Sequence, residues 1–168
     1  MTLDELREKA EQERNAQRRF VHSLRVCVAA GCLSAHSDDL KSALERELTQ
    51  ARLTETCKVK AVGCMGLCSA GPLVSVEPAG PLYQGATPAD APEIVHGLSA
   101  TPVERLECPR NLPFFARQLN LVLENSGRID PEKIEEYIAA GGYEALVRWL
   151  WSTECSKRPA VRRLLDTL

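Results

Sequence analysis

Four of the cysteines in this 168-residue chain form two closely spaced pairs. Cys27 and Cys32 enclose four residues, and Cys64 and Cys68 enclose three. The 31 residues between the pairs have the pattern of one helix followed by one strand, so a single α/β layer can bring both loops together. Two loops that offer two thiolates each are typical of a metal centre, above all of an iron–sulfur cluster.

Glycines occur in both cysteine loops, at Gly31, Gly63, Gly66 and Gly71. Thiolates are soft ligands that match iron bridged by sulfide, and four of them leave a net negative charge on the centre. Residues without a Cβ atom let backbone N–H groups approach the sulfur atoms and stabilise that charge. The composition of the loops therefore favours an iron–sulfur cluster.

Other interpretations of the cysteines differ in how well the spacing supports them. Zinc also binds four cysteines, and unrelated cysteines are often buried, so both of these alternatives stay open. A thioredoxin-type dithiol needs two intervening residues, which neither pair has. A plant-type ferredoxin would place a third cysteine where this chain has Ala35, so that class is excluded.

The remaining cysteines have the pattern of bystanders. We expect Cys57 to pack in a strand as a small hydrophobic residue, and we place Cys108 in a linker and Cys155 in a tail. His36 follows the first loop and is interpreted as a surface residue rather than a ligand. The polar N-terminus has no signal-peptide pattern, and seven cysteines without one indicate a reducing compartment, the cytoplasm.

Hydrophobic periodicity predicts a helix, a β-α-β unit, a β-hairpin and a further helix in the first hundred residues. Thr87, Pro88 and Asp90 have the pattern of a capping box with proline in the first turn, which marks the start of the last of these helices. The order of elements is that of a thioredoxin-like α/β fold. The expected elements cover 2–20, 24–29, 37–51, 56–62, 73–76, 82–84 and 87–98. Later in the chain, Phe115, Leu119, Val122 and Leu123 have the spacing of one buried helical face.

Composition excludes two classes of partner. A net charge of −2 gives no strong field for nucleic acid, and no nucleic-acid partner is expected. The sequence has no run of eighteen or more apolar residues, so we expect no direct membrane insertion. A hydrophobic content of 44% and a charged content of 26% are typical of a globular protein.

Three stretches, 62–68, 71–80 and 113–146, carry a family resemblance. The chain resembles the thioredoxin-like 2Fe–2S domain at the start of NADH-oxidising flavoprotein subunits. It looks most like the diaphorase subunit of bidirectional, NAD-reducing nickel–iron hydrogenases, which is related to the NADH-binding subunit of respiratory complex I. The resemblance covers about residues 2–150.

The resemblance implies a fold class, a cofactor and a domain organisation. The fold class is α/β, a thioredoxin-like 2Fe–2S ferredoxin domain followed by a small helical unit. We expect a docking helix, the ferredoxin domain, a linker, the helical unit and a basic tail, which cover 1–22, 23–99, 100–112, 113–150 and 151–168 in that order.

The resemblance also implies a ligand set and a function. Cys27, Cys32, Cys64 and Cys68 match the cluster ligands of the family, which transfers one electron at a time to or from flavoprotein or hydrogenase subunits. The chain has no Gly-x-Gly-x-x-Gly segment, so we expect no FMN or NAD site and no oxidation of NADH by this chain alone. The alternative is a non-redox module in which zinc or a degenerate cluster braces a docking surface at 113–150.

Overall fold

The computed structural model describes residues 2–109, 111 and 113–151. The chain forms two compact units. The larger unit runs from Arg18 to Glu132. The smaller unit consists of the described parts of Met1–Gln17 and Lys133–Leu168. Cys155 and nearly all of the tail predicted at 151–168 lie outside the described residues.

The larger unit contains a four-stranded mixed sheet with the strand order β2-β1-β3-β4. β1 and β2 are parallel, whereas β1 and β3, and β3 and β4, are antiparallel. The register pairs Cys27 with Val62. The carboxyl ends of β1 and β2 are therefore neighbours, and each strand leads directly into one cysteine loop. The strands are β1 (His22–Cys27), β2 (Cys57–Val62), β3 (Val74–Glu77) and β4 (Leu82–Tyr83).

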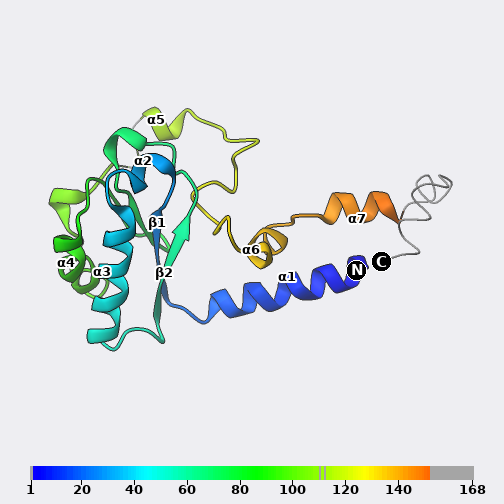
Figure 1. Cartoon of the computed structure of the whole chain (residues 1–168), viewed down its shortest axis with the longest axis horizontal. Coiled ribbons are helices and arrows are strands. Elements are labelled where there is room, and N and C mark those ends of the chain that lie inside the picture. Colours follow the sequence, from blue (N-terminus) through cyan, green and yellow to red (C-terminus); the bar gives the residue numbers. More distant parts are fainter. Residues whose placement is uncertain (1, 110, 112, 152–168) are drawn as a thin grey trace. The chain divides into compact units, whose positions relative to one another are not determined.

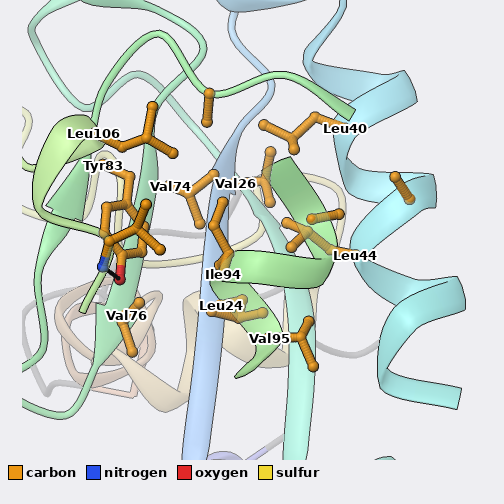
Figure 2. Close-up of a cluster of buried hydrophobic side chains, with 14 of the residues drawn as sticks. Leu24, Val26, Leu40, Leu44, Val74, Val76, Tyr83, Ile94, Val95 and Leu106 are labelled. Carbon is orange, nitrogen blue, oxygen red and sulfur yellow. Dashed lines mark hydrogen bonds between the residues drawn. The ribbon is translucent and has the colours of Figure 1, made fainter. Parts of the chain in front are cut away.

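Two helices, α3 (Ser37–Gln50) and α4 (Ala91–His96), pack together beside the sheet (Figure 1). Leu40, Leu44 and Leu48 follow one another at intervals of four residues and form the buried stripe of α3. Figure 2 shows Leu40 and Leu44 facing the same cluster as side chains from β1, β3 and α4. A fully buried leucine stabilises the fold by about 2 kcal/mol, so this cluster anchors the sheet that carries the cysteine loops.

The predicted capping box is confirmed at the turn (Pro88–Asp90) that leads into α4. The backbone N–H of Thr87 donates to Oδ2 of Asp90 over 2.7 Å, and the hydroxyl of Thr87 donates to the same oxygen over 2.7 Å. Arg105 donates to the other carboxylate oxygen of Asp90 over 2.6 Å and also pairs with Glu93. The start of α4 is therefore joined to a segment that lies later in the chain.

Residues 103–108 differ from the linker expected at 100–112, because they pack on the sheet. Val103, Leu106 and Cys108 are buried, and Glu107 forms an isolated antiparallel bridge with Tyr83 at the end of β4. The backbone N–H of Val103 donates to Oη of Tyr83 over 3.2 Å, a bond drawn as a dashed line in Figure 2. The segment shows no helical period because it follows the sheet edge and a short 3-10 turn (Glu104–Leu106).

The helix expected to bury one face over residues 115–123 is much shorter in the structure. α5 covers only Pro113–Ala116, and turns follow it. Leu119, Val122 and Leu123, whose periodicity suggested a buried face, are exposed, Val122 by 95%. An isolated helix of this length is marginal without tertiary packing, which explains why propensity alone does not extend it.

The smaller unit packs α1 (Leu3–Arg18) with α6 (Ile134–Ala139) and α7 (Glu144–Leu150). Leu6 and Ala10 of α1 are buried with Ile138 and Val147. Within this unit, Arg14 donates to the carbonyl of Ala139 over 3.1 Å. The structure thus joins the helix predicted at 1–22 to the end of the unit predicted at 113–150, because the apolar stripe of α1 is covered by these later helices.

None of the helices among residues 2–109, 111 and 113–151 is both long enough and apolar enough to cross a bilayer.

Candidate metal centre

The four candidate cysteines occupy the two loops that leave neighbouring parallel strands. Cys27 is the last residue of β1, and Cys32 lies in the short helix α2 (Ala30–Leu33). Cys64 comes two residues after β2, and Cys68 begins a 3-10 turn (Cys68–Ala70). The backbone N–H of Val28 donates to the carbonyl of Val62 over 2.9 Å, which holds the starts of the two loops together.

The loops also touch further along. A Cβ atom on Gly31 would lie 3.3 Å from Cβ and 3.8 Å from Sγ of Cys68, so the first loop approaches the second pair directly. A Cβ atom on Gly71 would lie 2.8 Å from Sγ of Cys32, so the chain after the second pair approaches the first pair. Because Gly31 and Gly71 have no side chain, each cysteine pair can pack against the backbone of the other loop.

The sulfur atoms of Cys64 and Cys68 lie 3.5 Å apart. The backbone N–H of Gly66 donates to Sγ of Cys64 over 3.3 Å. Gly66 has φ of +89°, a conformation that side chains rarely adopt, and this turn aims its N–H at the sulfur. An N–H donor of this kind stabilises negative charge on the Cys64 sulfur.

One side of the site is buried, and the other side is exposed to solvent. Cys27 and Cys32 are 1% and 0% exposed and belong to a buried cluster with Leu73 and Leu82, whereas Cys68 is exposed. Burial raises the pKa of the Cys32 thiol to about 12, and a hydrogen bond and charge from Cys27 add to the shift. Two thiols kept so close to one another are unfavourable as bare thiolates and are therefore suited to a cation that shares them.

The two pairs also act on each other electrostatically. The pKa of Cys68 is raised first by a hydrogen bond and charge from its neighbour Cys64, and the charge of Cys27 contributes as well. The charge of Cys68 in turn contributes to the raised pKa of Cys32. The two cysteine pairs thus lie near enough for the charge on one pair to affect the other.

A protein-family model for the thioredoxin-like [2Fe-2S] ferredoxin matches residues 14–99, about half of the 168 residues. The chain belongs to the thioredoxin-like [2Fe–2S] ferredoxin family. The predicted fold class and the predicted 2Fe–2S cofactor are confirmed by this match, and the chain is a ferredoxin-type electron carrier.

Relatives of this ferredoxin agree with the match. This chain is 36% identical over 78 residues to a 2Fe–2S ferredoxin from Clostridium pasteurianum. The aligned residues span 45% of this chain and 76% of that relative. This chain is also 38% identical over 72 residues to a 2Fe–2S ferredoxin from Aquifex aeolicus (strain VF5). The aligned residues span 42% of this chain and 65% of that relative.

The fold is also similar to a solved structure. The crystal structure of the wild-type thioredoxin-like [2Fe–2S] ferredoxin from Aquifex aeolicus superposes with a TM-score of 0.50 at 30% identity. The similarity covers 54% of this chain and 98% of the solved one.

The donor set of this ferredoxin suits a 2Fe–2S cluster, because thiolates are the soft ligands that match iron bridged by sulfide. A structural zinc ion takes four thiolates as well, so the family match and not the donor set decides for the cluster. Among the described residues, no three Cys, His, Asp or Glu side chains stand close enough together to hold one metal ion. The four cysteines are arranged as two pairs, each in its own loop.

The cysteines outside the two pairs have different surroundings. Cys57 is 2% exposed in the main core, as expected for a small hydrophobic residue, and burial raises its pKa to about 11. Cys108, interpreted from sequence as a linker bystander, is buried in the same cluster as Cys27 and Cys32. Only the pairing of its segment with β4 reveals this, and the local sequence gives no signal for it. His36 is exposed and its Nδ1 lies 3.3 Å from Asp39, in agreement with a surface role.

Proposed function

We propose that Cys27, Cys32, Cys64 and Cys68 ligate the 2Fe–2S cluster of this ferredoxin, and that the chain carries single electrons within an NAD(P)H-linked diaphorase or hydrogenase-type complex. The observation that supports the ligand set is the parallel register of β1 and β2, which pairs Cys27 with Val62 and starts both cysteine loops at one sheet edge. When bound, a 2Fe–2S cluster accepts or donates one electron at a time.

The residues of the chain have separable tasks in this proposal. Four thiolates supply the bonds to iron, and the N–H of Gly66 stabilises charge on Cys64. Leu73 and Leu82 pack with Cys27 and Cys32 and exclude water from that side. Added charge is then stabilised by fixed N–H donors rather than by reorienting solvent, which keeps reorganisation small.

The exposed side of the site suits contact with a partner that carries a second redox group. Cys68 is exposed, and Cys64 is half-buried. We propose that a flavoprotein or hydrogenase subunit approaches this side, because the stretches 62–68, 71–80 and 113–146 resemble a flavoprotein subunit of that class.

Metal analysis and spectroscopy of the purified protein test the ligand set. We expect about two irons and two acid-labile sulfides per chain and an EPR signal after reduction with dithionite. Cys64→Ser should lose most of the iron, whereas Cys57→Ser, which changes a buried cysteine in the main core, should retain it. Equal retention in both variants would disprove the assignment, and a colourless protein with one zinc per chain would support the non-redox alternative instead.

A reduction assay tests the partner class. We expect NADH alone to leave the visible spectrum of the oxidised protein unchanged, and NADH with a purified NADH-oxidising flavoprotein of the hydrogenase class to bleach it. Equal bleaching with and without the flavoprotein would contradict this part of the proposal.

A further inference from the structure

A segment beyond the matched ferredoxin residues reaches back to the second cysteine loop. The family match ends at residue 99, yet Ser126 donates its hydroxyl to the carbonyl oxygen of Cys64 over 2.7 Å. Both residues lie in the larger unit, within Arg18–Glu132. The bond is non-local, since the two residues are 62 positions apart.

The contact with this loop is not limited to one hydrogen bond. A Cβ atom on Gly127 would lie 3.0 Å from Cγ and 3.3 Å from Cα of Met65. A Cβ atom on Gly63 would lie 3.5 Å from Oγ of Ser126. The backbone of residues 126–127 therefore packs closely on residues 63–65, and Gly127, with φ of +73°, supplies the turn that permits it.

The start of the same segment packs near the first pair. Phe115 contacts the buried cluster that contains Cys27 and Cys32, and Met65 contacts it as well. Cys64, Gly66, Phe115 and Ser126 line one cavity of about 220 Å³. The segment thus contacts the second cysteine loop through Ser126 and Gly127, and the buried cluster that contains the first pair through Phe115.

We infer that Ser126 is a positioning residue that fixes the backbone of Cys64 and thereby orients its sulfur toward the cluster. The inference rests on the proposed ligand set. Met65 and Gly66 immediately follow Cys64, and the N–H of Gly66 donates to the Cys64 sulfur. A shift of the Cys64 carbonyl moves this donor and the sulfur together, because the loop backbone is continuous.

The inference is tested by comparing Ser126→Ala with Ser126→Thr, which restores a hydroxyl. Thr49→Val is the matched control, because Thr49 donates its hydroxyl to the carbonyl of Glu45 within α3. For Ser126→Ala we expect altered EPR g values and altered visible circular dichroism. We also expect iron release to a chelator about fivefold faster, which corresponds to about 1 kcal/mol, the usual net value of one hydrogen bond. Ser126→Thr should restore the parent spectrum and rate, and Thr49→Val should match the parent throughout.

A second variant changes the same contact at the neighbouring residue, Gly127. Gly127→Ala keeps the Ser126 hydroxyl but places a Cβ atom against Met65, and should shift the EPR spectrum in the same way. Parent-like spectra and release rates in both Ser126→Ala and Gly127→Ala would overturn the inference. If Cys64→Ser meanwhile loses the cluster, the ligand set stands and only the role of Ser126 fails. A parent-like cluster in Cys64→Ser would overturn both.

Discussion

A Cβ atom on Gly71 would lie 2.8 Å from the Sγ atom of Cys32, closer than carbon and sulfur can pack. The same atom would lie 3.4 Å from the carbonyl oxygen of Cys68, so it has little freedom to move away. Cys32 is fully buried and cannot swing into solvent. Gly71 therefore couples the position of a buried sulfur to the chain that follows the second cysteine pair.

Gly71→Ala should displace the Cys32 sulfur and strongly reduce iron content. Overpacking a filled interior costs about 1–3 kcal/mol, and the strain here falls on a proposed ligand. Iron per chain and the visible spectrum measure the outcome. Gly141→Ala is the control, because Gly141 has φ of +92° but open space around its Cβ position and belongs to the smaller unit, so that variant adds backbone strain outside the unit that carries the cysteines. Loss of iron in both variants would point to general instability rather than to the Cys32 contact.

Tyr83→Phe should lower the free energy of unfolding by about 1–2 kcal/mol, the cost of leaving a buried donor without a partner. Tyr83 is 1% exposed, and its hydroxyl oxygen accepts a hydrogen bond from the backbone N–H of Val103. The measurement is urea unfolding followed by circular dichroism in the far ultraviolet. Unchanged stability would mean that residues 103–108 contribute little to the domain. Tyr137→Phe, in the smaller unit and 42% exposed, provides the comparison.

The sequence predicts the elements of the ferredoxin domain well because their signals are local. The stripe of Leu40, Leu44 and Leu48 indicates α3, and Thr87 with Asp90 marks the start of α4. The two cysteine pairs stand out as candidate ligands by their spacing, and the structure starts both loops at one sheet edge because β1 and β2 are parallel neighbours. Local periodicity, capping and spacing are properties that a single sequence displays.

The features that the sequence does not predict depend on contacts between distant segments. Burial of Cys108 requires its segment to pair with β4, and the bond from Ser126 to Cys64 joins residues 62 positions apart. The periodicity of Leu119 and Leu123 indicates a buried helical face, but both are exposed in the structure. In the first two cases a contact between distant segments decides the outcome, and in the third the lack of tertiary packing leaves the predicted helix short.

Removal of the metal should leave thiols of very different reactivity. In the metal-free protein we expect maleimide to label Cys68 first, because Cys68 is exposed while Cys27 and Cys32 are 1% and 0% exposed. Mass spectrometry of peptides at successive times measures the order. Mild oxidation of the same sample should join Cys64 to Cys68, whose sulfur atoms are 3.5 Å apart before any bond forms. Uniform labelling at all four positions would contradict the burial gradient.

Asp90→Asn should lower the free energy of unfolding at pH 7 by about 1–2 kcal/mol. Burial raises the pKa of Asp90, but bonds from Thr87 and then Arg105 outweigh it and hold the pKa below its ordinary value. A lowered pKa in the folded state means that ionised Asp90 stabilises the fold above the ordinary carboxyl pKa of about 4. This contribution disappears as the pH falls through the folded-state pKa, because the acid then binds a proton in both states.

The pH dependence therefore separates this carboxylate from a packing effect. The difference in unfolding free energy between the parent and Asp90→Asn should be constant from pH 7 to about pH 5 and should shrink below about pH 4. Arg105 is 54% exposed, so solvent screens its share and moderate salt should reduce the difference slightly. Glu55→Gln, at an exposed turn, should show no comparable difference. If the difference in unfolding free energy stays the same down to about pH 2, the negative charge of Asp90 does not contribute to the stability of the start of α4. Asp90 would then stabilise the turn only through its packing and neutral hydrogen bonds.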